Sequence, residues 1–298
     1  MIDIVILTDS RYINPKKRDW YIEQVLTEDK ILEDKFKDQG LKVLKKDWAD
    51  TNFDWKSTKS VIFRTTWDYF EKFDLFSNWI KSTRSKTKFI NSYNTIIWNI
   101  DKHYLKDLSD LGINIPKTIF INKNQKTTLE SLFKKTKFKE AIIKPTISGA
   151  ARETYRINNK NHHQFEHIFR NLISNEDMIF QEFLNNIIDN GEISLIIIGG
   201  KYTHAVKKIA KKGDFRVQDD HGGKVIEYQP SMEEIKFAEK CIEICPYKCI
   251  YARVDIIYDN NNEISISELE LIEPELWFRN NQESAIKLAT EVKKLLLR

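Results

Sequence analysis

The stretch IYARVDIIYDNNNEISISELELIEPELWF, residues 250–278, is the part of the sequence that decides the expected fold. Two apolar runs flank the polar turn DNNNE, which predicts a β-hairpin of two buried strands. Asp255 lies in the first run. Glu268 and Glu270 lie two residues apart in the second, so their side chains point to one face. Converging carboxylates in an apolar setting are costly unless they are paired or bind a cation, and hard oxygen ligands favour Mg²⁺ or Mn²⁺. The stretch therefore predicts a metal site, and the alternative interpretation is a solvated polar face of the hairpin.

The composition is ordinary for a soluble protein. Of the 298 residues, 41% are hydrophobic and 31% are charged, and a chain of this length forms two or three modules. The 48 basic and 44 acidic side chains are interspersed and leave a net charge of +4, without the Lys/Arg block of a nucleic-acid-binding protein. No run approaches the ~20 apolar residues that span a bilayer, and the first residues lack the features of a signal peptide. We therefore expect a cytoplasmic protein that binds neither nucleic acid nor membranes.

Strands and helices alternate over residues 1–95, which predicts a small parallel α/β layer. Ligands of open α/β sheets bind beyond the carboxyl ends of the strands, so the segment RTTWDY at 64–69 is a candidate substrate wall. The alternative is a capped loop around a packed tryptophan. The expected strands are 2–8, 41–44 and 60–64, and the expected helices are 20–39 and 73–80.

A lysine at a strand end stands beside a loop of small residues in the middle of the chain. Lys144 ends the strand EAIIK at 140–144, and the loop TISGAA follows at 146–151. Small side chains let backbone N–H groups approach an anion, so the loop is a candidate phosphate cradle, although it matches neither the Walker nor the Rossmann pattern. The other elements expected in this half are helices at 99–111 and 127–135 and a strand at 117–121.

The polar loop KKGDFRVQDDHGGKV, residues 211–225, is the second candidate anion site. It combines Arg216, Gln218 and His221 with a glycine pair, and a guanidinium suits planar recognition of phosphate or carboxylate. Around this loop we expect strands at 177–184, 192–199 and 202–209, and helices at 230–245 and 282–297.

Taken in order, these features resemble the ATP-grasp superfamily of carboxylate–amine ligases. The features are a helix lysine, a strand-end lysine with its small-residue loop, QEFL, GEIS, FRVQ…HGG and a D…ExE hairpin. The resemblance covers nearly the whole chain. It implies an α/β (α+β) ATP-grasp fold, in which an N-terminal parallel α/β domain precedes two α+β lobes that sandwich ATP. The implied units are residues 1–95, a central lobe at 96–184 and a C-terminal lobe at 185–298 that carries the metal hairpin.

The resemblance also implies the residues of the site. Arg216 falls where RimK-type glutamate ligases carry an arginine near the transferred phosphate, and Arg216, Lys144 and Arg253 form the implied catalytic set. Asp255, Glu268 and Glu270 would hold Mg²⁺, with Mn²⁺ as the alternative. The commonest family pattern has asparagine at the last of these positions, so Glu270 adds a negative charge. The implied ATP contacts are Lys102, Lys144, Ser148, Gly149, Ala150, Glu182, Phe183, Leu184 and Glu192.

A narrower resemblance is to the branch that contains the cycloserine-forming (O-ureido-serine) cyclo-ligase. It is carried by RTTWDY, WNIDKHYL at 98–105, FRVQ…GG and ELELIEPEL at 268–276. We hypothesise that Arg64, Thr66, Asp68 and Tyr69 form the acceptor-substrate site, with Arg64 holding a substrate carboxylate. Glu273 would orient either Arg253 or the substrate.

Three functions compete at this point. The leading hypothesis is an ADP-forming ligase that acts through an acyl phosphate on a small amino-acid-like substrate, either joining two molecules or closing a ring. The second is a RimK-like ligase that modifies a peptide or protein. The third is a nucleotide-binding regulatory module without catalysis. A homodimer is compatible with each of them.

Overall fold

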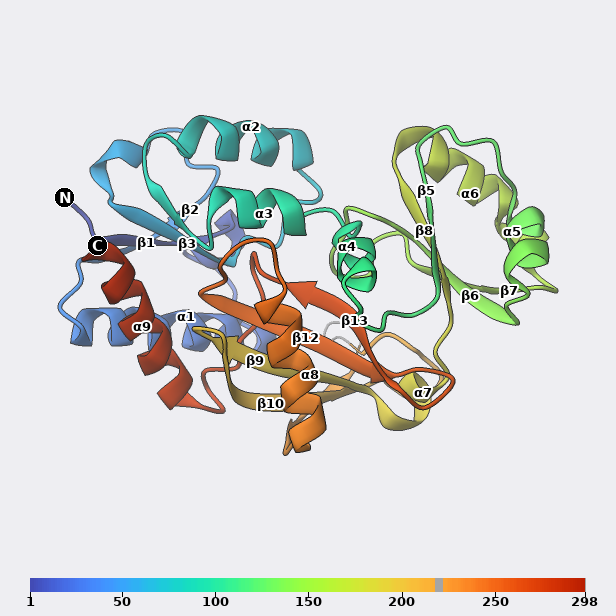
Figure 1. The fold of residues 1–298 in the computed structure, drawn as a ribbon. Helices are drawn as coiled ribbons and strands as arrows, with labels where there is room; N and C mark the ends of the chain where they lie inside the picture. Colours follow the sequence, from blue (N-terminus) through green and yellow to red (C-terminus); the bar gives the residue numbers. More distant parts are fainter. Residues whose placement is uncertain (218–221, 298) are drawn as a thin grey trace.

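The computed structural model describes residues 1–217 and 222–297, which form three sheets with helices packed on them (Figure 1). Gln218 and His221 of the polar loop lie outside the described residues. Among those that are described, no helix combines the length and apolarity needed to cross a membrane.

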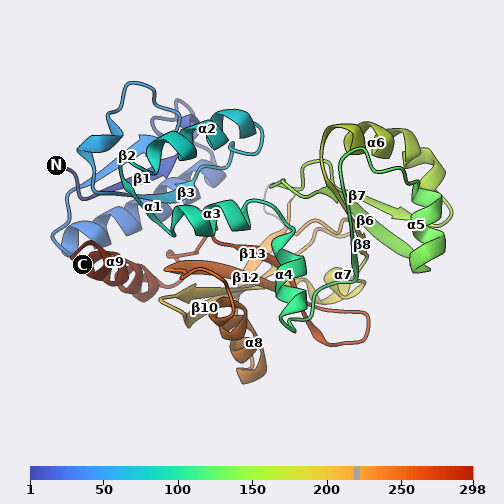
Figure 2. The same ribbon diagram turned by 45° about the horizontal axis from the view of Figure 1, so that its top comes forward.

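The N-terminal sheet is parallel, as predicted, and helices cover both of its faces. Its strand order is β2-β1-β3-β4. Successive residues of a strand point to opposite faces: Ile4 and Ile6 pack toward α1, while Val5 and Leu7 pack toward α2 and α3. Figure 1 shows α2 and α3 on one side of this sheet and α1 on the other, and Figure 2 shows the sheet between α1 and α2. The elements are β1 (Ile4–Thr8), α1 (Trp20–Asp38), β2 (Val43–Asp47), β3 (Ser60–Thr65), α2 (Phe73–Thr83), β4 (Lys88–Ile90) and α3 (Tyr93–Asn99).

The central lobe is an antiparallel sheet with two helices on one face. Its strand order is β5-β8-β6-β7, and its core includes Phe133, Phe169 and Phe180. The elements are β5 (Thr118–Ile121), α5 (Leu129–Thr136), β6 (Glu140–Pro145), β7 (Tyr155–Asn158), α6 (His162–Asn175) and β8 (Met178–Glu182).

The C-terminal lobe is built on an antiparallel sheet of order β11-β10-β9-β12-β13, in which the predicted hairpin forms one edge. Helices α4 and α8 cover one face of this sheet, and α9 covers the other and packs against α1 (Figure 1). The N-terminal domain and this lobe therefore share a core, and α4 joins the C-terminal sheet although it falls within 96–184. The elements are α4 (Tyr104–Asp110), α7 (Asn186–Asn190), β9 (Glu192–Ile198), β10 (Lys201–Ile209), β11 (Lys224–Tyr228), α8 (Met232–Glu243), β12 (Tyr251–Tyr258), β13 (Ile264–Glu270) and α9 (Gln282–Leu296).

The helix predicted at 99–111 is only partly right, because a turn separates the end of α3 at Asn99 from the start of α4 at Tyr104. The carboxylate of Asp101 accepts a hydrogen bond from the backbone N–H of His103 at 3.0 Å, which is the local turn that aspartate favours over a continuous helix. The backbone N–H of Lys102 donates instead to the carbonyl of Thr146 at 2.9 Å. The break thus places Lys102 on a turn against the small-residue loop.

The strand predicted at 41–44 is displaced, and β11 was not predicted. The observed β2 runs from Val43 to Asp47 and ends in Lys-Lys-Asp. Both β2 and β11 lie at the edge of their sheets, where one side of the strand is solvated and polar residues are tolerated. The alternation of apolar and polar residues that predicts a strand is therefore weak in β2 and β11.

His204 ties β10 to the segment that follows the hairpin, and this tie predicts a pH effect on stability. Its Nε2–H donates to the carbonyl of Leu276 at 2.9 Å, and burial lowers the pKa of His204 to about 4. The unfolded chain takes up the proton near pH 6.5 and the folded chain does so only near pH 4, so stability falls as the pH drops through this window. Urea unfolding should show a loss of about 3 kcal/mol from this group. The His204→Gln variant should lack that component, and equal pH slopes in the two proteins would contradict the assignment.

Candidate functional site

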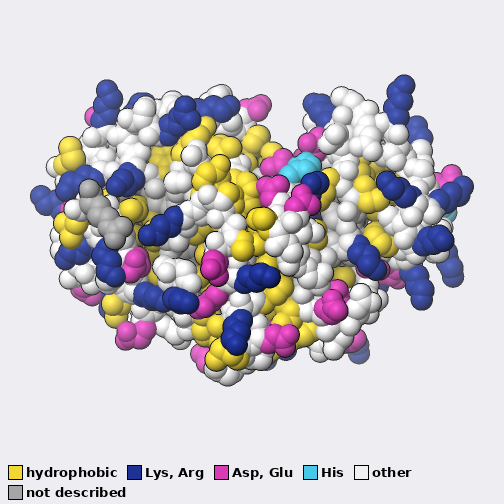
Figure 3. Space-filling model, viewed as in Figure 1, with side chains coloured by type: hydrophobic (Ala, Val, Ile, Leu, Met, Phe, Trp, Pro, Cys, Tyr) yellow, Lys and Arg dark blue, Asp and Glu magenta, His cyan; other side chains and the backbone are white. Residues whose placement is uncertain are grey.

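A cavity of about 620 Å³ lies where the three units meet. The molecular surface is also indented between the central lobe and the rest of the molecule (Figure 3). The N-terminal domain contributes Arg11, Tyr12, Trp67 and Phe70, among others, to the lining. The central lobe contributes Lys144, Ser148, Gly149, Ala150, Ala151, Glu182, Phe183 and Leu184, and the C-terminal lobe contributes Glu192, Lys208, Arg253, Glu268, Glu270 and Glu273.

The hairpin brings its three carboxylates together. Asp255 of β12 is paired with Glu268 of β13, and Arg253 is paired with Glu270, so these cross-strand neighbours lie side by side. One oxygen from each of Asp255, Glu268 and Glu270 lies within 4.8 Å of the other two. Glu268 and Glu270 line the cavity, whereas Asp255 is 1% exposed and lies behind them.

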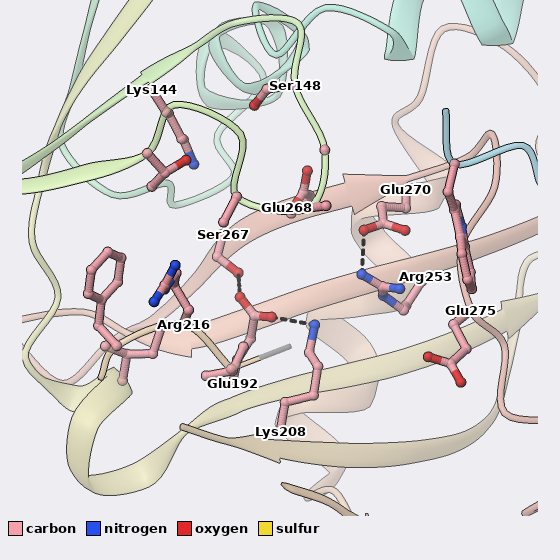
Figure 4. Close-up of a pocket in the computed structure, with 18 of the residues that line it drawn as sticks. Lys144, Ser148, Glu192, Lys208, Arg216, Arg253, Ser267, Glu268, Glu270 and Glu275 are labelled. Carbon is pink, nitrogen blue, oxygen red and sulfur yellow. Dashed lines mark hydrogen bonds and ion pairs between the residues drawn. The ribbon is translucent and has the colours of Figure 1, made fainter. Parts of the chain in front are cut away.

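Basic side chains balance the negative charge of this cluster. Arg253 donates from Nε and Nη2 to Asp255 at 2.8 to 3.1 Å and also pairs with Glu270. Lys208 of β10 is 3.1 Å from Asp255 and 2.5 Å from Glu192, and Lys102 is 3.1 Å from Glu268. Figure 4 shows Arg253 directed at Glu270, and Lys208 and Ser267 directed at Glu192. The extra charge of Glu270 is therefore compensated within the protein by Arg253.

The surroundings of the hairpin carboxylates shift their pKa values in different directions. Burial raises the pKa of Glu270 to about 7, with repulsion from Glu268 and Asp255 acting in the same direction. Burial also opposes ionisation of Glu268, but Lys102 and Lys144 outweigh it and hold the pKa of Glu268 below its usual value. For Asp255, Arg253 and Lys208 outweigh burial in the same way and keep the pKa low. Asp255 and Glu268 are thus the carboxylates of this cluster that stay ionised at neutral pH.

Lys102 and the small-residue loop are joined by a hydrogen bond in the cavity lining. The Nζ of Lys102 donates to the carbonyl of Ser148 at 2.5 Å. Ala150 and Ala151 adopt positive φ angles of 48° and 54°, a conformation that small residues tolerate better than bulky ones. Lys144, at the end of β6, faces the same cavity, and burial together with the charge of Lys102 lowers the pKa of Lys144. The loop and both lysines are positioned to surround a polyanion.

The proposed adenine and ribose contacts lie at another part of the lining. Glu182, Phe183 and Leu184 follow one another at the end of β8. Glu192 begins β9 and accepts a hydrogen bond from Ser267 Oγ at 2.8 Å. Arg216 also lines the cavity, and its guanidinium binds the carboxylate of Asp214 at 2.7 to 3.2 Å.

The structure does not bring Arg64, Thr66, Asp68 and Tyr69 to the cavity lining. Arg64 is 2% exposed and its guanidinium carbon lies 5.9 Å from the ring centre of Tyr251. Thr66 and Asp68 are buried, and the carboxylate of Asp68 accepts from Trp48 Nε1 at 2.7 Å.

Tyr69 is also buried, and it lies behind the cavity wall against Glu273, to which it is hydrogen-bonded. The segment after β3 is a capped turn, and its aromatic residues Trp67 and Phe70 reach the cavity instead. Glu273, predicted for the same substrate site, does line the cavity.

Two basic residues of the cavity lining, Lys208 and Arg11, were not predicted. The sequence pattern could have indicated Lys208, because it alternates with His204 and Val206 on the buried face of β10. A lysine on a buried face is rare unless acidic side chains pair with it. Arg11 follows the carboxyl end of β1, where ligands of α/β sheets bind, and it is paired with Asp9 at 2.7 Å.

A close approach between Gly149 and Phe70 predicts that the small-residue loop tolerates no Cβ at this position. A Cβ on Gly149 would lie 2.6 Å from Cε1 of Phe70. Gly149→Ala should displace the loop from the N-terminal domain and lower kcat/KM for ATP about tenfold, the effect of a displacement on the order of one ångström or less. The double variant Gly149→Ala/Phe70→Ala removes the clash and should recover most of the loss in steady-state assays. Failure of the second substitution to restore activity would show that the contact is not the cause.

Comparisons with known proteins place the chain in a family. The model of the RimK-like ATP-grasp domain matches residues 101–292, and the model of the N-terminal domain of D-cycloserine synthetase DcsG matches residues 4–91. Because the first match spans more than half of the sequence, the chain belongs to the RimK-like ATP-grasp family. It is an ATP-dependent ligase of the class that forms carbon–nitrogen bonds.

Among curated proteins, the cycloserine biosynthesis protein DcsG of Streptomyces lavendulae is 25% identical over 260 residues, which cover 82% of this chain and 85% of the relative. Among solved structures, D-cycloserine synthetase DcsG matches with a TM-score of 0.85 and 19% identity over 98% of this chain and 99% of the other. The D-alanine–D-alanine ligase of Bacillus anthracis matches with a TM-score of 0.67 and 14% identity over 100% and 98% of the two chains. The expected ATP-grasp fold is confirmed.

Proposed function

We propose that this ligase phosphorylates the carboxylate of a small amino-acid-like substrate with ATP, releases ADP, and then forms an amide-type bond to nitrogen. The observation that carries the proposal is the facing arrangement of Lys102 and Lys144 against the carboxylates of the hairpin, around one cavity. Figure 4 shows Lys144 and Ser148 on the opposite side of the site from Arg253 and Glu192.

The hairpin fits Mg²⁺, with Mn²⁺ as the alternative, because its oxygen ligands lie within 4.8 Å of one another and two of them line the cavity. Asp255, Glu268 and Glu270 would hold the ion. When bound, the ion supplies positive charge that offsets the charge of the triphosphate.

The residues of the cavity support two chemical steps. A substrate carboxylate oxygen forms a bond to the γ-phosphorus as the bond to the ADP oxygen breaks, and Lys102, Lys144 and Arg216 offset the charge in this step. An uncharged nitrogen then attacks the acyl carbon, loses a proton, and phosphate leaves. Arg253 is held at the cavity wall by Asp255 and Glu270, where its guanidinium would face the acyl oxygen. The Ser148–Ala151 loop would exclude water from the acyl phosphate.

The cavity size supports a small acceptor. A volume of about 620 Å³ lies in the range of small-molecule sites, and the relatives named for cycloserine act on a small molecule. The second candidate is a peptide acceptor, because the ATP-grasp ligase PsnB, solved with a minimal precursor, matches with a TM-score of 0.65 and 14% identity over 100% of both chains.

ADP release measured against pools of amino acids, O-ureido-serine and short peptides tests the proposal. We expect ADP release that depends on a single small amino-acid-like compound. The product mass then separates cyclisation, in which one molecule loses water, from joining of two molecules. Release supported by peptides alone would favour the second candidate. Tight ATP binding without turnover in any pool would favour a regulatory module.

A further inference from the structure

Trp277, which follows the metal hairpin, adopts a backbone conformation that a bulky side chain rarely takes. Its φ angle is 47°, in the left-handed region, where a bulky residue costs free energy and persists only if the surrounding structure fixes it. The carbonyl of the preceding residue, Leu276, accepts a hydrogen bond from His204 Nε2 at 2.9 Å. The backbone N–H of the following residue, Phe278, donates to the carboxylate of Glu28 at 2.8 Å. The fold therefore fixes the chain on both sides of Trp277.

The indole of Trp277 also lacks a hydrogen bond. The residue is 1% exposed, and its Nε1–H has no partner in the part of the chain that the structure describes. A buried indole N–H usually has an acceptor, and one without an acceptor lowers stability. Trp277 nevertheless lines the cavity. A large residue that is kept beside a site at a cost in both backbone and side chain indicates a function for its ring.

The Trp277 ring lies beneath the guanidinium of Arg253. The guanidinium carbon is 5.4 Å from the ring centre, within the range of cation–π attraction, which is strongest where little water is present. Asp255 and Glu270 bind the same guanidinium through its Nε and Nη2, and Figure 4 shows it directed at Glu270. Hydrogen bonds along one edge leave this planar group free to tilt about that edge, whereas a ring beneath it restricts the tilt.

We infer that Trp277 is a positioning residue of the ligase, whose ring fixes the orientation of the Arg253 guanidinium so that Nη1 reaches the acyl oxygen of the substrate. Nη1 is the nitrogen of this group that makes no hydrogen bond to a described residue. The inference rests on the proposed function. Negative charge develops on the acyl oxygen as nitrogen attacks the acyl phosphate, and a donor stabilises this charge only within hydrogen-bond distance. Because Trp277 acts through Arg253, loss of its ring should lower kcat more than it raises KM.

The kinetic test compares two substitutions of the same ring. Trp277→Leu removes the aromatic face, and Trp277→Phe keeps one. With the substrate identified by ADP release, Trp277→Leu should lower kcat about tenfold, less than the factor on the order of 10² that removing such a donor outright would have. The KM values for ATP and for the substrate should change by about threefold or less. Trp277→Phe should retain at least about a third of the wild-type kcat, because phenylalanine also offers a face to the cation.

Phe278→Leu is the matched control. Phe278 is the next residue, is fully buried, and has the guanidinium carbon of Arg64 5.6 Å from its ring centre, but it is not among the described residues that line the cavity. This variant should lose stability as Trp277→Leu does, and its kcat should stay within about threefold of the wild-type value. Equal losses of kcat in the two leucine variants, or a wild-type kcat in Trp277→Leu, would overturn the inference.

A second measurement reports the orientation of Arg253 and needs no turnover. In NMR spectra of the arginine side chains, the Nε–H signal of Arg253 is assigned by its loss in Arg253→Lys. The ring current of Trp277 should act on this signal, so it should move in Trp277→Leu, move less in Trp277→Phe, and stay in place in Phe278→Leu. The phenylalanine variant keeps the inference testable if the leucine variant does not fold.

The two measurements separate the inference from the proposed function. An Nε–H signal that does not respond to either substitution of Trp277 would overturn the inference, whatever the kinetics show. A signal that responds as expected in a protein that releases no ADP with any substrate would support the contact between Trp277 and Arg253 and would count against the proposed ligase.

Discussion

Replacing Glu268 with glutamine is expected to lower kcat for ADP release by a factor on the order of 10²–10³, the effect of removing one charged group that stabilises a transition state. Glu268 is the hairpin carboxylate that both lines the cavity and is held ionised by Lys102 and Lys144. As a proposed Mg²⁺ ligand it needs this charge. The Mg²⁺ concentration for half-maximal activity should rise about tenfold or more.

Glu270→Gln is the informative control for this prediction. It removes the same charge from the neighbouring ligand, where an uncharged amide is the common family pattern. Glu270 also has Arg253 as a partner and a pKa raised to about 7. We therefore expect a loss smaller than about tenfold in the same titration. The metal assignment fails if Glu268→Gln leaves the Mg²⁺ dependence unchanged, or if the two variants cannot be distinguished.

Lys208→Met is expected to destabilise the fold by about 3–5 kcal/mol, because it leaves buried carboxylates without a cation. The side chains of Lys208 and Asp255 are 6% and 1% exposed, and Lys208 also pairs with Glu192. Methionine preserves the length of the aliphatic stem, so the loss reports the charge. Urea unfolding at neutral pH gives the free energy of unfolding directly.

The adjacent lysine supplies the comparison. Lys207 points to the opposite face of β10, where its Nζ lies 4.6 Å from the ring centre of Tyr228. Lys207→Met should change the free energy of unfolding by about 1 kcal/mol or less. Similar losses at positions 207 and 208 would mean that Lys208 does not neutralise the hairpin carboxylates.

Local patterns were sufficient for the elements that carry the metal hairpin. The alternation of β13 put Glu268 and Glu270 on one face, and the polar turn predicted the hairpin that brings Asp255 near them. The exact pairing of Asp255 with Glu268 depends on a register shift between Asp255 and Ile256 that no local pattern indicated. The position of Lys144 at the end of a strand and the loop of small residues after it could also be predicted from the sequence. Each of these features depends on residues near one another in the chain.

Contacts between distant segments were not predictable in the same way. Lys208 meets Asp255 across 47 positions, and Glu28 of α1 accepts a hydrogen bond from the backbone N–H of Phe278 across 250 positions. The predicted substrate wall at 64–69 reaches the cavity lining only through Trp67, for a related reason. Periodicity does not show which side chains of an irregular turn face a cavity, and here Trp67 and Phe70 do so instead of Arg64.

The most direct test of the central claim follows an oxygen atom. The carboxylate of the substrate identified by ADP release would be labelled with heavy oxygen, and the released phosphate analysed by mass spectrometry. A ligase that forms an acyl phosphate transfers a single labelled oxygen from each carboxylate to phosphate, because the bond between carboxylate oxygen and phosphorus survives the attack of nitrogen. Turnover with unlabelled phosphate would contradict the account.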